Sequence, residues 1–200
     1  SPTLEENEIC GNRQDGVFIR EAQPIMTKNW IHNNQEVGVR IFSSSFSLLN
    51  NNIHDNEKYD VYNDPQKDVK VEANDNWWGT KEGLKIIGKI FGRVDYQRVL
   101  DAPYPQGKPV ELPILKGPLG GLVERDSFLT LAHSPYVLEK DVRVEKGAIL
   151  FIEPGVTLKY NPGTSIIVKD GGIDARGTAE RVITFTSNSS SPTPGSYTSA

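Results

Sequence analysis

The chain has 200 residues, of which 36% are hydrophobic and 24% are charged, and its formal net charge is −4. This composition indicates a globular chain rather than a disordered one, and the length allows one large domain or two small ones. The acidic balance comes without a basic stripe, so we expect no nucleic-acid partner, and no apolar run approaches the roughly 18 residues of a membrane span.

Cysteine usage and the start of the chain bear on the setting of the protein. Cys10 is the only cysteine in the sequence, so no internal disulfide is expected. This scarcity fits a secreted bacterial protein, and we expect an extracellular or cell-envelope location. No signal peptide is present and the sequence opens in mid-repeat at Ser1-Pro2, so we expect a segment of a longer protein.

Residues 2–61 contain one motif written three times at a step of 22 residues, with no gap. The sets that fall in register are Asn7, Asn29 and Asn51; Ile9, Ile31 and Ile53; Asn12, Asn34 and Asn56; Gly16, Gly38 and Asp60; and Val17, Val39 and Val61. Self-similarity at a short fixed period is typical of stacked-repeat proteins.

Each copy of the motif reads as short strands joined by turns. Bursts such as Val17-Phe18-Ile19 alternate with a period of two, which indicates strand, and Asn, Gly and Asp between them indicate tight turns. The copies lack the spaced leucines of a leucine-rich repeat, and the bursts are too short for helices. The sequence therefore predicts a solenoid in which each coil lies on the previous one.

Stacking gives the regular 22-residue spacing of the asparagines a physical role. Successive coils lie about 4.8 Å apart, so an Asn at the same place in each coil can pass its amide to the next. Such a ladder satisfies polar groups that would cost roughly 1–3 kcal/mol each if they were left unpaired. Ile9, Ile31 and Ile53 are expected to form one vertical file beside it.

The pattern Asn-x-Ile-x-x-Asn followed by Gly-Val-x-Ile resembles the repeat of the right-handed parallel β-helix family, which has a pectate-lyase-like fold. The nitrous-oxide-reductase accessory type and many secreted bacterial proteins carry it. The resemblance covers residues 1–100 and 135–187 and implies an all-β, right-handed parallel β-helix (solenoid) with a short helical cap and a second β-helix start. It is specific for the fold and nearly silent on function.

Three outward columns are candidate binding features, one of Cys and His and two that contain aromatic residues. Cys10, His32 and His54 align, and thiolate and imidazole suit zinc or copper. Three ligands on a flat sheet face rarely converge, however, and a fourth is not evident, so we assign no metal site and leave metal binding by this column open.

The second kind of column is aromatic. It consists of Phe18, Arg40 and Tyr62, with Arg20, Phe42 and Asp64 in a further column beside it. Outward aromatic side chains can stack on sugar rings, but they also serve as packing partners across strands, which is the interpretation we favour here.

The period breaks after Asn63. Asn76 follows Asn51 by 25 residues, so we expect the ladder to continue after an insertion of three. The resemblance implies that Trp77-Trp78 covers the end of the core, rather than forming a carbohydrate platform. A short helix is predicted over residues 81–91, with Leu84, Ile87 and Phe91 on one face, followed by a last extended segment that closes the solenoid.

The domain plan has three parts. Residues 1–100 are the C-terminal coils and cap of a β-helix, and residues 101–134 are a Pro-rich linker with a strand pair over residues 119–131. Residues 135–200 are the N-terminal coils of a second β-helix, or of the same one rejoined. In the last part Gly155 and Gly177 are again 22 residues apart. We favour tandem units over coils that rejoin within or between chains.

No catalytic chemistry is recognised. A calcium-binding carboxylate cluster beside a basic residue, as pectate-type lyases need, is not in register, nor are the converging carboxylates of a hydrolase. The aspartates are assigned to turns, where this residue is common: Asp15, Asp60, Asp64, Asp170 and Asp174. We therefore assign no catalytic residue and no cofactor.

The predicted function is a non-catalytic β-helix module of a secreted or cell-envelope bacterial protein, a structural spacer or a carbohydrate- or protein-binding face. The alternative is a polysaccharide lyase, glycoside hydrolase or epimerase of the pectate-lyase-like fold. Expected partners are a polysaccharide or another envelope protein, and open strand edges favour end-to-end self-association. Asn188-Ser189-Ser190 satisfies the glycosylation pattern, which a bacterial source would leave unused.

Overall fold

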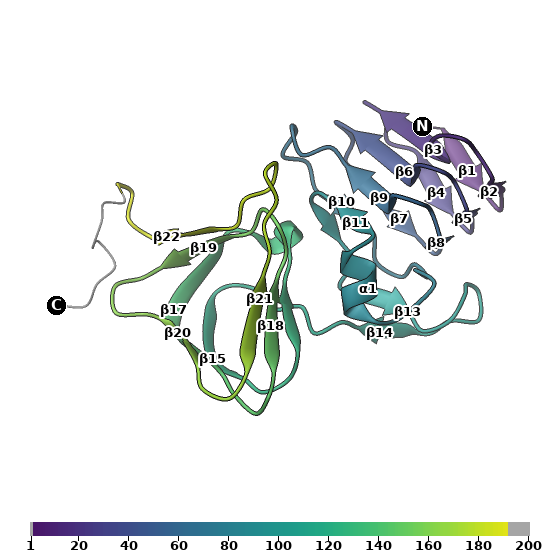
Figure 1. The fold of residues 1–200 in the computed structure, drawn as a ribbon. Coiled ribbons are helices and arrows are strands. Elements are labelled where there is room, and N and C mark those ends of the chain that lie inside the picture. The colour runs from purple at the N-terminus through teal and green to yellow at the C-terminus, as the bar shows by residue number, and fades with distance from the viewer. Residues whose placement is uncertain (1, 192–200) are drawn as a thin grey trace. The chain divides into compact units, whose positions relative to one another are not determined.

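A computed structural model of the chain describes residues 2–191 (Figure 1). The chain forms two compact units, unit 1 (residues 1–112) and unit 2 (residues 113–200), and each is described by itself. Both are built of short strands that pair in parallel, with a single pair of antiparallel strands among the described residues. The expected all-β parallel solenoid is confirmed.

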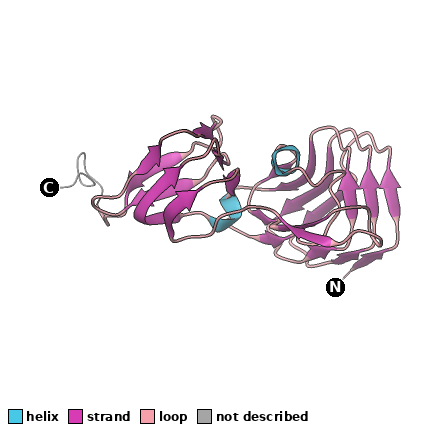
Figure 2. Cartoon of the chain, turned by 90° about the horizontal axis from the view of Figure 1, so that it is seen from below, coloured by secondary structure: helices cyan, strands magenta, loops and turns pink. Residues whose placement is uncertain are grey.

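Unit 1 begins with three regular coils of three strands each. They are β1 (Thr3–Glu5), β2 (Glu8–Cys10) and β3 (Val17–Arg20); β4 (Ile25–Thr27), β5 (Trp30–His32) and β6 (Val37–Phe42); and β7 (Leu48–Leu49), β8 (Asn52–His54) and β9 (Tyr59–Asn63). The coils stack into three parallel sheets, β1-β4-β7, β2-β5-β8 and β3-β6-β9, the last of which continues into β11 (Ile90–Phe91). Their strands lie side by side in Figure 2.

The register of these sheets places like residues above like residues. Ile9 is the partner of Ile31, and Ile31 is the partner of Ile53, so the three form the expected vertical file. Ile31 and Ile53 are fully buried. Alternation along β2, β5 and β8 therefore turns one isoleucine of each strand toward the core and its two neighbours toward the opposite face.

The first asparagine ladder is present and continues after the insertion, as expected. The backbone N and Nδ2 of Asn7 both donate to Oδ1 of Asn29 at 3.1 Å, and those of Asn29 donate to Asn51 at 3.0 Å. Asn51 donates in the same way to Oδ1 of Asn76, at 2.9 and 3.2 Å. Each Asn is preceded by a left-handed residue: Glu6, Lys28, Asn50 and Asp75.

A second ladder runs from Asn12 through Asn34 to Asn56. It ends on Asp60, whose Oδ1 accepts from the backbone N of Asn56 at 3.2 Å and from Nδ2 at 2.9 Å. Asp60 stands where the earlier copies have glycine, and the structure gives the reason. A Cβ on Gly38 would lie 2.6 Å from Nδ2 of Asn56, so glycine leaves room for the rung of the next coil.

Asp60 corrects one expectation from the sequence. It is 2% exposed and lies within β9, rather than in a turn. No further Asn follows in this ladder, and the carboxyl group occupies the place that the next rung would fill. Asp174 was likewise assigned to a turn, and it lies in strand β21 (Gly172–Ala175).

The remaining part of unit 1 is less regular. It contains β10 (Val71–Glu72), α1 (Gly83–Ile87), β11 (Ile90–Phe91), β12 (Val94–Asp95), β13 (Arg98–Leu100) and β14 (Pro109–Glu111). Strand β11 extends the sheet of β9, and β13 pairs with β14 in antiparallel fashion. Trp78 is 4% exposed and Trp77 is partly exposed, and the coil that contains them is followed by β12 and β13.

The helix predicted over residues 81–91 is wrong in extent and in face. Only residues 83–87 are helical, and Phe91 belongs to β11. Ile86 is the buried residue of α1, whereas Leu84 is 52% exposed. Gly88 follows the helix directly, and β pairing with β9 takes over from local helical preference two residues later.

Unit 2 is a second parallel stack. Its elements are β15 (Leu119–Val123), β16 (Ser127–Leu129), the 3₁₀ turn η1 (Leu131–His133), β17 (Tyr136–Val144), β18 (Ile149–Ile152), β19 (Thr157–Tyr160), β20 (Ile166–Val168), β21 and β22 (Thr184–Ser187). The sheets are β15-β17-β19-β22, with β20 on β17, and β16-β18-β21. Leu138, Val144, Leu150 and Leu158, each 0% exposed, lie at the centre of the core.

The strand pair predicted over residues 119–131 is also corrected. Strands β15 and β16 do not pair with each other; β15 pairs with β17, and β16 pairs with β18. Within the Pro-rich segment, β14 adds a strand to unit 1. Parallel partners further along the chain, which local composition does not reveal, decide where these residues go. No helix within residues 2–191 is long and apolar enough to cross a membrane.

Candidate functional site

The outer face of sheet β2-β5-β8 carries the column of Cys10, His32 and His54 that the sequence singled out. Cys10 is the register partner of His32, and His32 is the partner of His54. A second column, Glu8, Trp30 and Asn52, runs beside it on the same face, because residues two apart in a strand point the same way.

His54 is held by its neighbours. The indole Nε1 of Trp30 donates to Nε2 of His54 at 3.0 Å, and Nδ1 of His54 lies 2.7 Å from Oδ2 of Asp55. An indole N–H is only a donor, so Nε2 of this ring accepts and Nδ1 carries the proton toward Asp55. The nitrogen that would face a metal is therefore already engaged.

His32 meets a different set of partners. Its Nε2 lies 3.1 Å from Oε1 of Glu8, and Sγ of Cys10 lies 4.0 Å from the same oxygen. The three ligand atoms of Glu8, Cys10 and His32 all lie within 4.8 Å of one another. The structure thus brings Cys10 and His32 together, leaves His54 out and adds Glu8, which the sequence analysis missed. The signal for Glu8 was its spacing of two from Cys10.

The aromatic column lies on the outer face of sheet β3-β6-β9-β11. Arg40 is the register partner of both Phe18 and Tyr62, and Tyr62 is the partner of Phe91. The Arg40 guanidinium lies 4.8 Å from the centre of the Tyr62 ring, and the Tyr62 and Phe91 rings stack at 4.6 Å. Packing across strands, the favoured interpretation, accounts for these three side chains. Phe18 at the end of the column is 57% exposed.

Asp15 fixes the guanidinium of this column. Its Oδ2 accepts from Nε of Arg40 at 2.6 Å and its Oδ1 accepts from Nη2 at 3.0 Å. This paired hydrogen bonding raises the pKa of Arg40 above its ordinary value. In the adjacent column Arg20 lies 5.1 Å from the centre of the Phe42 ring, whereas Asp64 falls just outside β9.

Among the described residues, burial strongly raises the pKa of two carboxyl groups, one in each unit. Burial raises the pKa of Asp60 to about 7, opposed by hydrogen bonds from Asn56 and by the charge of Lys89. Burial also raises the pKa of Glu153 to about 7, opposed by the backbone N–H of Leu131, which donates to Oε2 at 2.7 Å. Both groups are almost completely buried and accept hydrogen bonds from their own unit, Asp60 from Asn56 and Glu153 from Leu131, which indicates a structural role for each.

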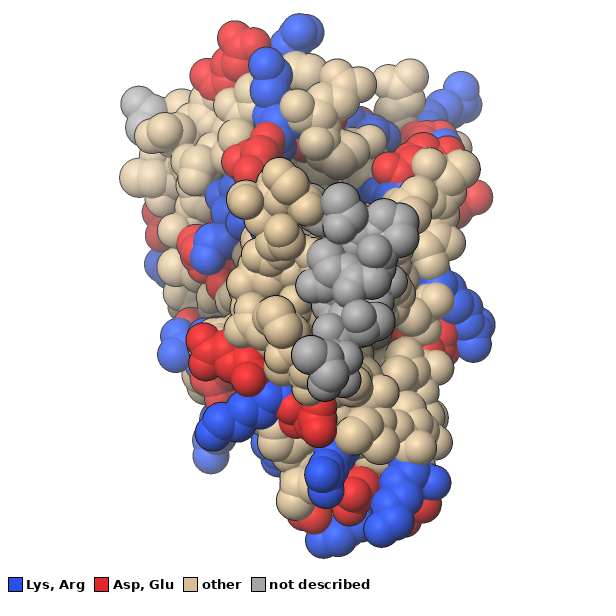
Figure 3. Space-filling model, turned by 90° about the vertical axis from the view of Figure 1, so that its left-hand side faces the viewer, with Lys and Arg blue, Asp and Glu red and all other residues tan. Residues whose placement is uncertain are grey.

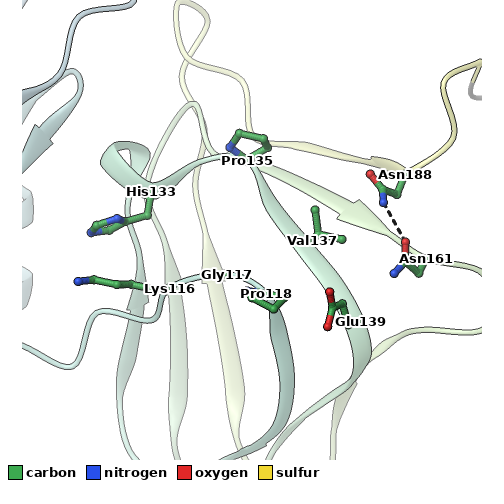
Figure 4. Close-up of a pocket in the computed structure, with 9 residues that line it drawn as sticks. All are labelled: Lys116, Gly117, Pro118, His133, Pro135, Val137, Glu139, Asn161 and Asn188. Atoms are coloured by element: carbon green, nitrogen blue, oxygen red, sulfur yellow. Dashed lines mark hydrogen bonds between the residues drawn. The ribbon is translucent and has the colours of Figure 1, made fainter.

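Unit 2 has an open pocket of about 550 Å³ (Figure 4). Its lining residues are Lys116, Gly117, Pro118, His133, Pro135, Val137, Glu139, Asn161 and Asn188. Asn188 Nδ2 donates to Oδ1 of Asn161 at 2.9 Å, which occupies the amides at one end. Lys116, His133 and Glu139 do not converge on a common point in the figure, and this arrangement points to no particular reaction.

Charges of both signs are mixed on one face of the molecule. On the face drawn in Figure 3, Lys and Arg alternate with Asp and Glu, and neither sign forms a continuous patch. Some charged residues are paired across coils, as Arg98 is with Asp75 in unit 1 and Lys146 with Glu124 in unit 2.

Comparison with known proteins supports the fold for most of the chain. Residues 1–86 match the family model described as "Right handed beta helix region", and residues 121–199 match the "Pectate-lyase like beta helix domain". No solved structure gives a significant match.

A curated relative comes from an animal. The chain is 35% identical over 116 residues to "Protein bark beetle" of Drosophila melanogaster, an alignment that covers 48% of this chain and 4% of the relative. The chain therefore spans only a small part of the length of that protein. An insect relative does not support the bacterial source expected from the sequence. Each unit is thus a parallel solenoid whose sequence is similar to a β-helix family, the right-handed β-helix region over residues 1–86 and the pectate-lyase-like β-helix domain over residues 121–199.

Proposed function

We propose that this chain is a non-catalytic β-helix module that acts as a rigid spacer within a larger secreted or cell-surface protein. The observation that carries the proposal is the use of the buried polar side chains. Asn29, Asn51 and Asn76 are 0% exposed, and their amides bond one coil to the next. Side chains used in this way resist bending and slippage between coils, which a spacer requires.

The exposed carboxylates also favour a structural role over a lyase or hydrolase. Within residues 2–191, the one group of three close metal-ligating side chains contains a single carboxylate, Glu8. A calcium-dependent lyase would need several carboxylates in one place, because calcium takes six to eight oxygen ligands. Asp15 and Asp75 are instead paired with arginines.

Hydrogen exchange and a turnover assay test this function together. We expect the backbone N–H groups of Asn29 and Asn51 to exchange only through unfolding of unit 1, because both are bonded inside a continuous ladder. We expect no cleavage of uronate polymers with or without calcium. Rapid local exchange at these N–H groups would contradict the proposal of a rigid spacer. Cleavage of a uronate polymer would contradict the proposal that the module is non-catalytic.

Carbohydrate binding is a second candidate function, supported by the exposed ring of Phe18. This ring ends the column that runs through Arg40 to the stacked rings of Tyr62 and Phe91, and its open face can stack on a sugar ring. A glycan array should then show binding that Phe18→Ala abolishes. Phe185→Ala is the matched control, because Phe185 is 51% exposed but lies on unit 2. Equal loss in both variants, or no binding by the parent chain, would count against this surface.

The proposed secreted location predicts a modification at Asn188. Asn188-Ser189-Ser190 is a glycosylation acceptor and all three side chains are exposed. When the longer protein is made in animal cells, mass spectrometry should find an N-linked glycan on Asn188, and Ser190→Ala should remove it while Ser189→Ala keeps it. An unmodified Asn188 in all molecules would argue against passage through the secretory pathway.

A further inference from the structure

The three side chains Glu8, Cys10 and His32 form a cluster on the outer face of sheet β2-β5-β8 that neither the fold nor the proposed spacer function explains. Two come from edge strand β2 and one from β5, the strand paired with it. Cys10 is directly beside His32 in the parallel register. The side chains of Glu8 and Cys10 are exposed, so both can turn without disturbing the core.

We propose that Glu8, Cys10 and His32 bind a zinc ion. Zinc takes a thiolate at about 2.3 Å and an imidazole nitrogen at about 2.0–2.1 Å in tetrahedral geometry, which places ligand atoms about 3.5 Å apart. The corresponding atoms here lie 3.1 to 4.8 Å apart. Small rotations of two exposed side chains close the difference, and water supplies the fourth ligand.

His32 is the fixed member of the site. Its side chain is only 14% exposed, and its ring packs 5.2 Å from the Trp30 ring and stacks 5.8 Å from the His54 ring. Packing of this kind holds Nε2 toward Glu8, so little side-chain freedom is lost when the metal binds. On the other side of the ring, Nδ1 lies 3.0 Å from the Asn33 amide. With its amide turned, Asn33 offers a carbonyl to an Nδ1 proton, as the partners of metal-bound histidines do.

The donor set selects the metal. One sulfur, one imidazole nitrogen and one carboxylate oxygen suit zinc, whereas magnesium and calcium prefer oxygen ligands alone. The bound ion would link β2 to β5 and thus the first described coil to the second. A ligand that binds only the folded chain stabilises it, so zinc should raise the melting temperature of unit 1.

Cobalt, which adopts the same geometry and has visible spectra, provides the first test. Titration of the metal-free 200-residue chain with Co²⁺ should produce a thiolate charge-transfer band and tetrahedral d–d bands that saturate at one equivalent, and Zn²⁺ should abolish both. Absence of the charge-transfer band at one equivalent, or octahedral d–d spectra, would overturn the proposal.

Variants separate this site from adventitious binding by a thiol. Cys10→Ser, His32→Gln and Glu8→Gln should each weaken zinc binding by about ten-fold or more. Glu57→Gln is the matched control for Glu8→Gln, because Glu57 is also an exposed glutamate but lies outside the cluster, and it should leave the affinity within about two-fold. Circular dichroism checks that each variant is folded. Affinity that depends on Cys10 but is unchanged in His32→Gln and Glu8→Gln would overturn the site.

Discussion

Single amides inside the solenoid connect its coils. Asn51 donates through Nδ2 to the carbonyl oxygens of Met26 at 3.1 Å and Leu49 at 2.8 Å, and its Oδ1 accepts from Asn29. Its side chain therefore satisfies polar groups in its own coil and in the coil before it. We expect Asn51→Ala to lower the free energy of unfolding by about 3 kcal/mol or more, because several buried groups lose their partner together.

Asn7→Ala is the matched control for this change. Asn7 belongs to the same ladder but is exposed at its open end, where water can replace the amide. Its cost should stay below about 1 kcal/mol. Urea denaturation of both variants measures the difference, and equal losses would show that the ladder does not depend on burial.

A single carboxyl group, Asp60, should make the stability of unit 1 depend on pH. Its pKa is about 7 in the folded state against 3.8 for an exposed aspartate, so the folded chain keeps a proton that the unfolded chain releases. The contribution of this bound proton to the free energy of unfolding is fully present below about pH 4 and is lost as the pH rises toward 7. At about 1.4 kcal/mol per pKa unit, the loss is at most on the order of 4 kcal/mol.

Asp60→Asn keeps the acceptor for Asn56 and removes the charge. The variant should lose this part of the pH dependence and be more stable than the parent chain above pH 7. Thermal unfolding of unit 1 between pH 4 and pH 8 measures the effect. Glu153→Gln is the corresponding change in unit 2, where the pKa is also about 7. If the stability of Asp60→Asn depends on pH as that of the parent chain does, Asp60 is not the source of the pH dependence.

Between elements, the coils approach so closely that one methyl group matters. A Cβ on Gly38 would lie 2.6 Å from both Nδ2 of Asn56 and the backbone oxygen of Asp60. Gly38→Ala should therefore push the coil of β4, β5 and β6 away from the coil of β7, β8 and β9. The free energy of unfolding should fall by about 1–3 kcal/mol.

Gly88→Ala is the control for this glycine change. Gly88 has a negative φ, and the nearest atom to its added Cβ would be 3.6 Å away. This variant should change the free energy of unfolding by less than about 0.5 kcal/mol. A similar loss in the two variants, measured by denaturant titration, would argue against close approach of the coils as the cause.

At the level of the whole molecule, each unit has a core of its own, and we expect two separate unfolding transitions in calorimetry. Ile53 and Leu150 are both fully buried, the first in unit 1 and the second in unit 2. Ile53→Ala should lower the free energy of unfolding of unit 1 by about 2–5 kcal/mol and so lower the melting temperature of one transition only. Leu150→Ala should do the same to unit 2 and to the other transition. Joint movement of both transitions in either variant would mean that the units unfold as one.

The sequence by itself determined the repeat architecture. The step of 22 residues fixes which side chains stack, so the isoleucine file, both asparagine columns and the aromatic column follow from counting along the chain. The same counting placed Asn76 in the ladder after the insertion. Period and spacing are properties of the sequence alone, and a parallel stack converts them directly into contacts.

Only the tertiary structure decided the features that depend on pairing between different columns or distant segments. The indole of Trp30 donates to Nε2 of His54, whereas Nε2 of His32 lies beside Glu8. The sequence contains all four residues but does not show which of them pair. The extent of α1 and the partners of β15 and β16 were set by parallel strands elsewhere in the chain, which local preference does not encode. Asp60 became a buried end of a ladder because no later coil supplies the next amide.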